Sequence, residues 1–184
     1  THSIFFYPSV STFTSAAIHD PPMNTKKTAL TILLGLMTLL SMAQCFPDVK
    51  VEDTKGKAVR TASLINGKAP VVVAFWSSTC KYCIEEIDAL SEALADLPDI
   101  SCKVVCVSVD DSRSISRAKA MVKSHDWDGF TLLYDTNRNL YRSLNVVYIP
   151  QLFVYDKKGR QIHSHTGYSA GDELETLKII KNNQ

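Results

Sequence analysis

The sequence has no surplus of charge of either sign and no basic block. Its 184 residues include 20 lysines and arginines against 19 aspartates and glutamates. Nucleic-acid-binding domains usually carry a basic patch that faces the phosphate backbone, so we expect no nucleic-acid partner. Internal repeats and low-complexity segments are also absent. The composition, 45% hydrophobic and 21% charged, predicts one globular domain with an ordinary core.

Cysteine is scarce, and its spacing does not favour a structural zinc site. The chain has five cysteines, and only Cys80 and Cys83 form a Cys-x-x-Cys pair. A structural zinc ion usually takes four ligands, such as a second Cys-x-x-Cys or a histidine pair. We therefore expect neither a metal nor a cofactor, although zinc remains a minor alternative. The other candidate ligands lack finger spacing: Cys102, Cys106, His163 and His165.

Cys102 and Cys106 are also poorly placed to bond to each other. They lie four residues apart on an expected strand, which at a rise of about 3.3 Å per residue separates their Cα atoms by roughly 13 Å. A disulfide requires a Cα separation below about 7 Å. We expect Cys106 to be a small buried apolar side chain and Cys102 to be more exposed. His163 and His165 should share one face of their strand, which alone is a weak case for a metal.

No apolar run is long enough for a comfortable membrane span. The longest, residues 29–40, is shorter than the roughly 20 residues that a spanning helix needs. It follows a short basic segment and precedes a small-x-small site, which is the arrangement of a secretory signal peptide. We expect a signal peptide at residues 23–43, cleaved after Ala43, and a single domain at residues 46–184. Residues 1–22 show no periodicity and are expected to be a disordered upstream extension.

Export would determine the redox environment of the cysteines. Disulfides persist outside the cytosol, and a lysine-led leader without a further apolar span suggests the bacterial periplasm. A eukaryotic secretory route also remains open. Membrane attachment could arise in two ways: through an uncleaved leader, or through a lipid on Cys45.

A Cys-x-x-Cys pair stands where a buried strand gives way to a helix. Residues 71–76 are continuously apolar and rich in β-branched side chains, which predicts a strand buried on both faces. From Cys83 to Leu97 apolar residues recur at three- and four-residue spacing, as on one face of a helix. Cys80 then lies at the helix N-terminus, where unpaired N–H groups and the macrodipole favour a thiolate. Cys83, one turn along, is close enough to form a disulfide with Cys80, which supports reversible dithiol–disulfide chemistry.

The remaining patterns predict an α/β fold with a central mixed sheet and helices on both faces, because strands and helices alternate along the chain. The expected elements are an N-terminal hairpin (strands 49–51 and 58–60), a strand at 71–76, a helix at 81–97, a strand at 104–109, a helix from the caps at 110–112 to 124, a strand at 130–134, a helix at 139–144, a hairpin at 152–155 and 161–165, and a helix at 170–181.

Three motifs make this sequence similar to the thioredoxin fold. They are the Phe-Trp-x-x-x-Cys-x-x-Cys segment that ends at Cys83, the Ile149-Pro150 dipeptide that opens a strand, and the Asp-Lys-Lys-Gly turn at residues 156–159. Together with the leader, the N-terminal hairpin and the inserted helix before Ser124, they resemble exported thiol–disulfide oxidoreductases of the TlpA/ResA type, within the thioredoxin and AhpC-TSA superfamily. The resemblance runs from about Phe46 to the C-terminus.

The resemblance implies roles for four residues. Cys80 would be the attacking nucleophile, and Cys83 would resolve the mixed disulfide. Pro150 would follow a cis peptide bond and face the cysteines, where the backbone beside it pairs with an extended polypeptide. Glu86 matches the glutamate of a Cys-x-x-Cys-x-x-Glu pattern and would tune cysteine protonation or contact the substrate. A plainer interpretation of Glu86, and of Glu85, is an acid that complements the helix dipole.

The sequence also departs from the family pattern beside the cysteines. Thr79 replaces a tryptophan, and Ala74 stands where cytoplasmic thioredoxins bury an aspartate, which shifts any proton relay toward Glu86 or water. Lys81 adds a positive charge that should stabilise the Cys80 thiolate. Trp76 most simply packs beneath the active site. The residues expected around the substrate groove are Trp76, Thr79, Lys81, Tyr82 and Ile149.

These features predict an exported thiol–disulfide oxidoreductase that exchanges disulfides with envelope proteins. The family favours a reductant, with apocytochromes among its substrates and a membrane or periplasmic redox partner as its electron donor. One alternative is a noncatalytic envelope interaction module with a static disulfide. The other is a thiol peroxidase, since Ser77 stands three before Cys80 as in peroxiredoxins. Two features argue against a peroxidase: Val73 stands where the peroxiredoxin pattern has proline, and that pattern has no need of Cys83.

Overall fold

The computed structural model describes residues 46–184. The expectations for the upstream extension, the signal peptide and Cys45 lie outside the described residues. Within this range no helix combines the length and apolar character needed to cross a bilayer. The elements in chain order are β1 (Lys50–Asp53), β2 (Ala58–Arg60), the 3₁₀ helix η1 (Thr61–Leu64), β3 (Val71–Trp76), α2 (Lys81–Asp96), β4 (Lys103–Ser108), α3 (Ile115–Val122), β5 (Thr131–Tyr134), α4 (Asn139–Ser143), β6 (Gln151–Tyr155), β7 (Gln161–Thr166) and α5 (Asp172–Lys181).

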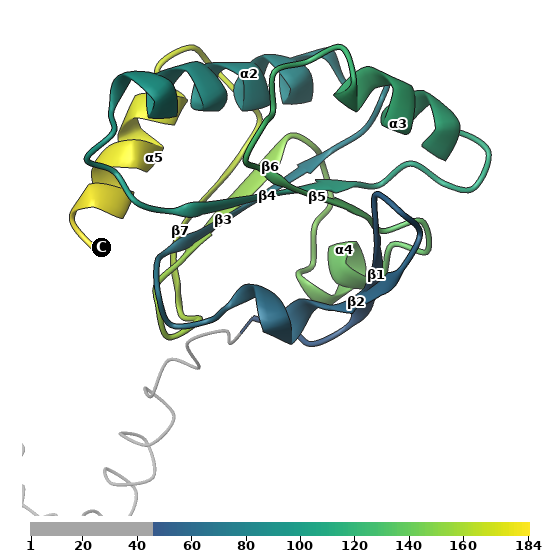
Figure 1. The fold of residues 1–184 in the computed structure, drawn as a ribbon, viewed down its shortest axis with the longest axis horizontal. Coiled ribbons are helices and arrows are strands. Elements are labelled where there is room, and N and C mark those ends of the chain that lie inside the picture. The colour runs from purple at the N-terminus through teal and green to yellow at the C-terminus, as the bar shows by residue number, and fades with distance from the viewer. Residues whose placement is uncertain (1–45) are drawn as a thin grey trace, which may run out of the picture. The chain divides into compact units, whose positions relative to one another are not determined.

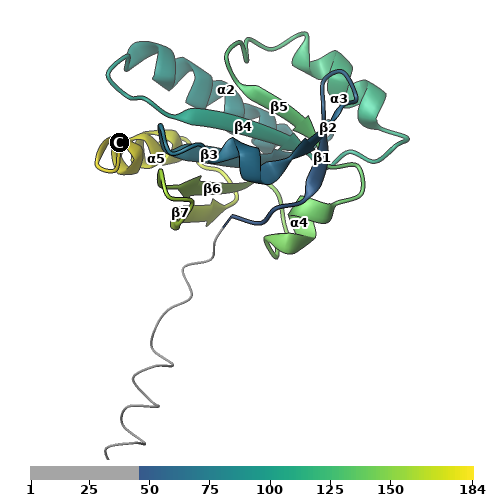
Figure 2. The same cartoon turned by 60° about the horizontal axis from the view of Figure 1, so that its bottom comes forward.

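The strands form one seven-stranded mixed sheet in the order β2-β1-β5-β4-β3-β6-β7. Strands β3, β4 and β5 are parallel to one another, whereas β6 runs antiparallel to β3 and to β7. The β1–β2 hairpin extends the sheet beyond β5 at one edge, and the β6–β7 hairpin closes the other edge (Figure 2). The prediction of a mixed central sheet is confirmed.

Strand β3 occupies the middle of the sheet and is buried along its whole length. Its neighbours β4 and β6 cover both of its edges, which leaves its backbone fully paired. A strand in this position needs apolar side chains on both faces, and the Val-Val-Val-Ala-Phe-Trp sequence supplies them. The bounds predicted from the apolar run agree with those of the structure.

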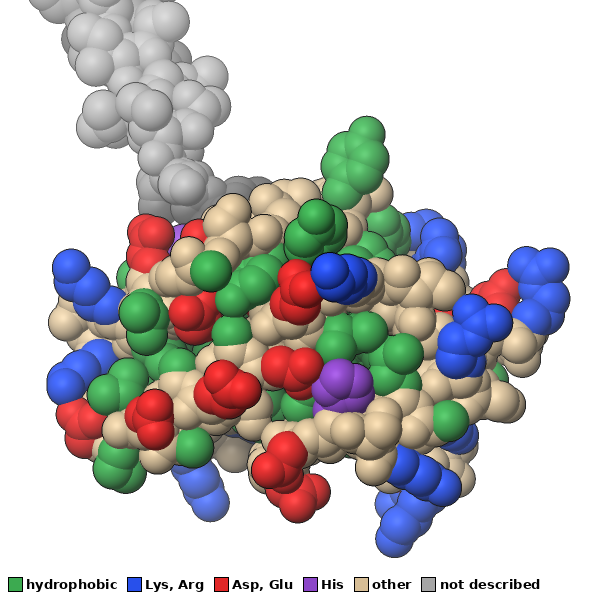
Figure 3. All heavy atoms as spheres, turned by 90° about the horizontal axis from the view of Figure 1, so that it is seen from above, with side chains coloured by type: hydrophobic (Ala, Val, Ile, Leu, Met, Phe, Trp, Pro, Cys, Tyr) green, Lys and Arg blue, Asp and Glu red, His purple; other side chains and the backbone are tan. Residues whose placement is uncertain are grey.

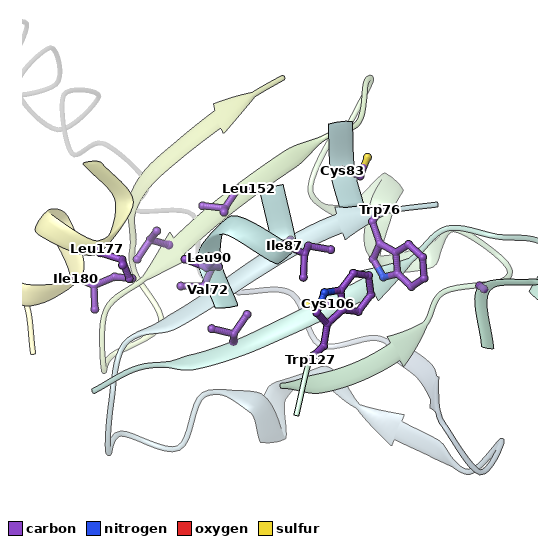
Figure 4. Packing of buried hydrophobic residues seen from close by; sticks show 14 of the residues in the cluster. Val72, Trp76, Cys83, Ile87, Leu90, Cys106, Trp127, Leu152, Leu177 and Ile180 are labelled. Atoms are coloured by element: carbon purple, nitrogen blue, oxygen red, sulfur yellow. The ribbon is translucent and has the colours of Figure 1, made fainter. Parts of the chain in front are cut away.

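Helices cover both faces of the sheet (Figure 1). Helices α2, α3 and α5 pack on one face, and α4 lies on the other. On the face covered by α2, α3 and α5, Ile87 and Leu90 of α2 pack in one apolar cluster with Val72 of β3. Leu177 and Ile180 of α5 belong to the same cluster (Figure 4). The predicted arrangement of helices on both faces is therefore confirmed.

Trp127, whose place the sequence does not predict, lies at the end of this apolar layer. It is 3% exposed, and its ring meets that of Trp76 edge-on at a centroid distance of 5.1 Å. Its indole Nε1–H donates to Asp88 Oδ1 of α2 at 2.7 Å, and His125 lies 2.9 Å from the same carboxylate. The segment between α3 and β5 is thereby attached to the helix that carries the cysteines.

Two helices begin later than predicted. Helix α3 starts at Ile115 because the preceding residues form a turn, in which Asp111 Oδ1 accepts hydrogen bonds from the backbone N–H groups of Arg113 and Ser114. Helix α5 starts at Asp172, after Gly171 adopts φ +106°, a left-handed conformation that glycine tolerates best.

The β6–β7 turn forms as predicted. Asp156 Oδ1 accepts hydrogen bonds from the backbone N–H groups of Lys158 and Arg160, at 2.8 and 2.9 Å. Gly159 completes the turn with φ +77°, a conformation that side-chain-bearing residues rarely adopt. This turn sets the register that brings β7 beside β6.

Candidate active site

The two cysteines of the Cys-x-x-Cys motif are joined by a disulfide at the start of α2. Their Cα atoms are 5.3 Å apart, within the range that a disulfide spans. Cys80 is the N-cap of α2, and the backbone N–H of Cys83 donates to Cys80 Sγ at 3.3 Å. In the reduced protein the same N–H group and the helix dipole would stabilise a Cys80 thiolate.

The two sulfurs differ in their access to solvent. Cys80 is half-buried, whereas Cys83 is 0% exposed and belongs to the apolar cluster beneath α2. A large substrate can therefore reach Cys80 only. This asymmetry agrees with the expectation that Cys80 meets the substrate first and Cys83 follows.

A buried aspartate holds the loop that carries Cys80. Asp110 follows β4 and is 5% exposed. Its carboxylate accepts hydrogen bonds from the backbone N–H of Ser78 at 2.8 Å, from Ser78 Oγ at 2.7 Å and from Ser108 Oγ at 2.9 Å. The sequence pattern predicts Asp110 as one of the caps of the following helix, whereas the structure makes it an acceptor for the cysteine loop. The position of Asp110 follows from the pairing of β3 with β4. These strands are parallel neighbours, so the residues after β4 lie beside the loop that follows β3.

We expect Asp110→Ala to destabilise the protein by about 1–3 kcal/mol, because the Ser78 N–H and hydroxyl would lose their buried acceptor. The rate of disulfide exchange at Cys80 should also fall, since the loop loses its attachment to β4. Urea unfolding and the rate of reaction with a small disulfide measure the two effects. The neighbouring Asp111, which is more exposed than Asp110, offers the control: Asp111→Ala should affect both measurements less.

Pro150 lies at the same edge of the sheet as the cysteine loop. The Ile149-Pro150 bond is cis, as predicted. Gln151, the next residue, pairs with Phe75 of β3, which places Pro150 beside the end of β3 where the cysteine loop begins. Pro150 is buried and its carbonyl accepts from the N–H of Gly167 at 2.8 Å, while Ile149 is half-buried.

The residues expected around the groove fall into two groups. Thr79, Lys81 and Tyr82 are exposed next to Cys80, and Tyr82 is 61% exposed, unusual for an aromatic side chain. Trp76 is 1% exposed and packs against Trp127, so its burial favours support from beneath the site over direct contact with a substrate.

Two residues that sequence reasoning missed extend this surface. Val147 and Tyr148 directly precede Ile149-Pro150 and are 69% and 72% exposed. The signal in the sequence was an apolar pair in a loop next to the proline. Like Tyr82, they are large apolar side chains that remain exposed and have no packing role within the described residues. Exposed apolar side chains of this kind are expected on a surface that meets another polypeptide.

Lys81 shares its charge with an acidic side chain of the same helix. Its Nζ lies 3.4 Å from Glu85 Oε1, one turn along α2. Acidic side chains gather over the face of the molecule that α2 covers (Figure 3). The expected stabilisation of a Cys80 thiolate therefore depends more on the N-terminus of α2 than on Lys81. The acidic residues of α2 at this face are Glu85, Asp88, Glu92 and Asp96.

Glu86 points inward and lies beyond the first turn of α2, so the plainer interpretation of a first-turn acid does not describe its position. Its side chain is 2% exposed, and Oε1 lies 2.5 Å from Nε2 of His165 on β7. Burial raises the pKa of Glu86, and the His165 hydrogen bond opposes that shift. The same hydrogen bond raises the pKa of His165. Both groups therefore bind a proton more readily than they would in water.

The sheet register explains how His165 reaches α2. Cys106 of β4 pairs with Ala74 of β3, Ala74 pairs with Leu152 of β6, and Leu152 pairs with His165. Paired residues project to the same face of a sheet, so these four side chains form a row beneath α2. Glu86 comes from the helix above this row. Ala74 has no carboxyl group, and Glu86 brings one from α2 to the same side of the sheet.

The two other cysteines within residues 46–184 are not suited to exchange. Cys106 is fully buried, and burial, with a smaller contribution from the charge of Glu86, raises the pKa of its thiol. Cys102 is half-buried just before β4, and burial raises its pKa to about 11. Neither forms a disulfide, and both thiols stay protonated at neutral pH. Across residues 46–184 no three histidine, cysteine or acidic side chains cluster closely enough to hold a metal ion.

Comparisons with known proteins agree with this geometry. A profile of the AhpC/TSA family matches residues 42–163. The thiol-disulfide oxidoreductase ResA of Bacillus thuringiensis subsp. konkukian is 25% identical over 129 residues, which cover 70% of this chain and 72% of that protein. The thiol-disulfide oxidoreductase YkuV of Bacillus subtilis is 24% identical over 139 residues, covering 74% of this chain and 93% of that protein.

A solved structure extends the agreement to the fold. The solution structure of an uncharacterized thioredoxin-like protein from Porphyromonas gingivalis has a TM-score of 0.65 with this chain at 31% identity, covering 77% of this chain and 95% of that one. This similarity confirms the predicted thioredoxin fold. The protein belongs to the AhpC/TSA family, as a thioredoxin-like thiol–disulfide oxidoreductase of the TlpA/ResA type.

Proposed function

We propose that this protein is an exported reductant that transfers electrons to disulfides of envelope proteins, including those of apocytochromes, through Cys80 and Cys83. One observation carries the proposal: a half-buried sulfur at a helix N-terminus is bonded to a fully buried one. A membrane or periplasmic redox partner would return the pair to the dithiol form. The leader-like segment before residue 44 supports export.

The exchange proceeds in two steps. The Cys80 thiolate attacks one sulfur of a substrate disulfide, a bond forms between Cys80 Sγ and that sulfur, and the other substrate sulfur leaves as a thiolate. Cys83 then loses its proton and attacks Cys80 Sγ, which releases the second substrate thiolate. Two electrons pass to the substrate, and the protein returns to the disulfide form.

The substrate would lie against the loop before Pro150. The exposed side chains of Tyr82, two residues after Cys80, and of Val147 and Tyr148, just before the cis bond, offer apolar contacts. The backbone beside Ile149 would pair with an extended segment of the substrate. A surface of this kind suits unfolded polypeptides, whose cysteines are accessible and whose backbone is unpaired.

The reduction potential tests the direction of electron flow. We expect a value close to that of thioredoxin, about −270 mV, and far from the value of about −120 mV found for a strong oxidant. Equilibration of the Cys80–Cys83 pair with glutathione or dithiothreitol buffers, followed by thiol counting, provides the measurement. A potential near the oxidant end would reverse the proposed direction while leaving the exchange chemistry in place.

Reactivity distinguishes the proposed enzyme from the two alternatives. Iodoacetamide should alkylate Cys80 of the reduced protein faster than it alkylates glutathione at neutral pH, because only the thiolate reacts. A static disulfide would resist dithiothreitol and leave Cys80 slow to react. A thiol peroxidase would consume hydrogen peroxide when reduced, and we expect negligible consumption here.

A further inference from the structure

A second pair of titratable side chains lies next to the cysteines. Glu86 of α2 is buried against His165 of β7 at 2.5 Å, and the residues that meet are 79 positions apart in the chain. The second carboxyl oxygen of Glu86, Oε2, has no hydrogen-bond partner among the described residues. A buried carboxyl oxygen without a partner is costly, so its retention suggests a use.

Glu86 is close to the buried cysteine. Cys83 and Glu86 are three residues apart on α2, a spacing that places side chains next to each other on one helix face. Both are buried on the face turned toward the sheet. Cys83 has no direct access to solvent, yet it must lose a proton before it can attack Cys80. Glu86 is the nearest ionisable side chain along the helix that is also buried.

A chain of side chains leads from Glu86 to the surface. His165 keeps 19% of its side chain exposed, and its Nδ1 lies 3.4 Å from Nε2 of His163. His163 is half-buried on the same strand and the same face of the sheet, because Val72, Val154 and His163 form the next row of paired residues. The predicted common face of the two histidines is confirmed.

We propose that His165 acts through Glu86 as a positioning residue for proton transfer, so that Glu86 takes the proton of Cys83 and His165 passes it toward His163 and solvent. This inference rests on the proposed function and concerns its second step. The substrate disulfide and the dithiol protein (one thiolate and one thiol) yield the disulfide protein, two substrate thiolates and one proton. That single proton is the one that His165 would carry.

The other groups around the pair set its pH dependence. Asp172 and Glu175 of α5 and Tyr168 before that helix approach from one side, and Cys106 of β4 lies beneath. The His165 hydrogen bond lowers the pKa of Glu86 against the effect of burial. Removing His165 should therefore keep Glu86 protonated to a higher pH, where it cannot accept a proton from Cys83.

Reaction of the reduced full chain with dithiobis(nitrobenzoate) separates the two steps. The attack of Cys80 releases one coloured thiolate, and the attack of Cys83 releases the second. We expect His165→Gln to slow the second release about tenfold at neutral pH and to move its half-maximal rate to higher pH, with the first release unchanged. In a Glu86→Gln background, His165→Gln should not slow the second release further, because both substitutions interrupt the same path of proton transfer.

A second histidine that pairs with an acidic side chain of α2 provides the control. His125 also pairs with an acidic residue of α2, Asp88, but away from Cys83, so His125→Gln should leave both releases unchanged. If His165→Gln fails to fold, the wild-type protein decides the question: the second release, and not the first, should be slower in deuterium oxide.

Each outcome has one meaning. An unchanged second release in His165→Gln, an equal slowing of both releases at every pH, or the absence of an isotope effect on the second release would overturn the relay while leaving the proposed function intact. A wild-type protein that releases only one thiolate would overturn the proposed function and the relay together.

Discussion

Replacing Cys80 with serine is expected to abolish disulfide exchange, whereas replacing Cys83 with serine should trap the substrate. Cys83 is fully buried, so it cannot substitute for Cys80 as the attacking group. Without Cys83 the mixed disulfide between Cys80 and the substrate has no internal thiol to resolve it. Insulin reduction measures the loss of activity, and nonreducing electrophoresis followed by mass spectrometry detects and identifies the trapped partner.

A third cysteine supplies the control for this experiment. Cys102 lies outside the site and is half-buried, with a pKa raised to about 11 by burial. Cys102→Ser should retain the wild-type rate and trap nothing. Trapping by Cys80→Ser instead of Cys83→Ser would mean that the order of attack inferred from burial is wrong. Envelope proteins with cysteine pairs are the partners expected in the trapped complex.

The largest loss of stability is expected from Trp127→Ala, which should lower the free energy of unfolding by about 3–5 kcal/mol. The substitution removes a ring that packs edge-on against Trp76 and takes away the indole donor to Asp88. Both changes affect the layer beneath α2, so the exchange rate should fall as well. Urea or guanidinium unfolding measures the stability, and the slope of the transition shows whether two-state behaviour holds.

Trp127→Phe separates the packing of the ring from its hydrogen bond. Phenylalanine keeps most of the contact with Trp76 but cannot donate to Asp88, so the loss should be smaller than in the alanine variant. A loss of similar size in both variants would show that the hydrogen bond to Asp88, and not the ring contact, holds this segment in place.

Much of the fold follows from local patterns. The apolar run at residues 71–76 and the helical spacing after Cys83 are properties of neighbouring residues, and both elements form with nearly the predicted bounds. Helix starts were less predictable. Asp111 and Gly171 form turns ahead of α3 and α5, so that α3 starts at Ile115 instead of directly after the caps at 110–112 and α5 starts two residues late.

The site was only partly predictable for a related reason. Cys80 and Cys83 are neighbours in the sequence, so their pairing and their position at a helix N-terminus could be inferred directly. Asp110 could not, because its acceptor role depends on β3 and β4 ending at one edge of the sheet. The exposure of Val147 and Tyr148 depends likewise on how the loop before the cis bond leaves the core.

The amino-acid sequence alone determined the chemistry of this protein: a reactive sulfur where a buried strand meets a helix, with its partner one turn on. Only the tertiary structure decided which protonatable side chains lie on the buried side of α2, below Cys83. Glu86 and His165 meet because four strands pair in one register, and a shift of one residue would turn His165 to the opposite face. Local periodicity specifies elements, whereas contacts between distant elements depend on the register and burial that the whole fold imposes.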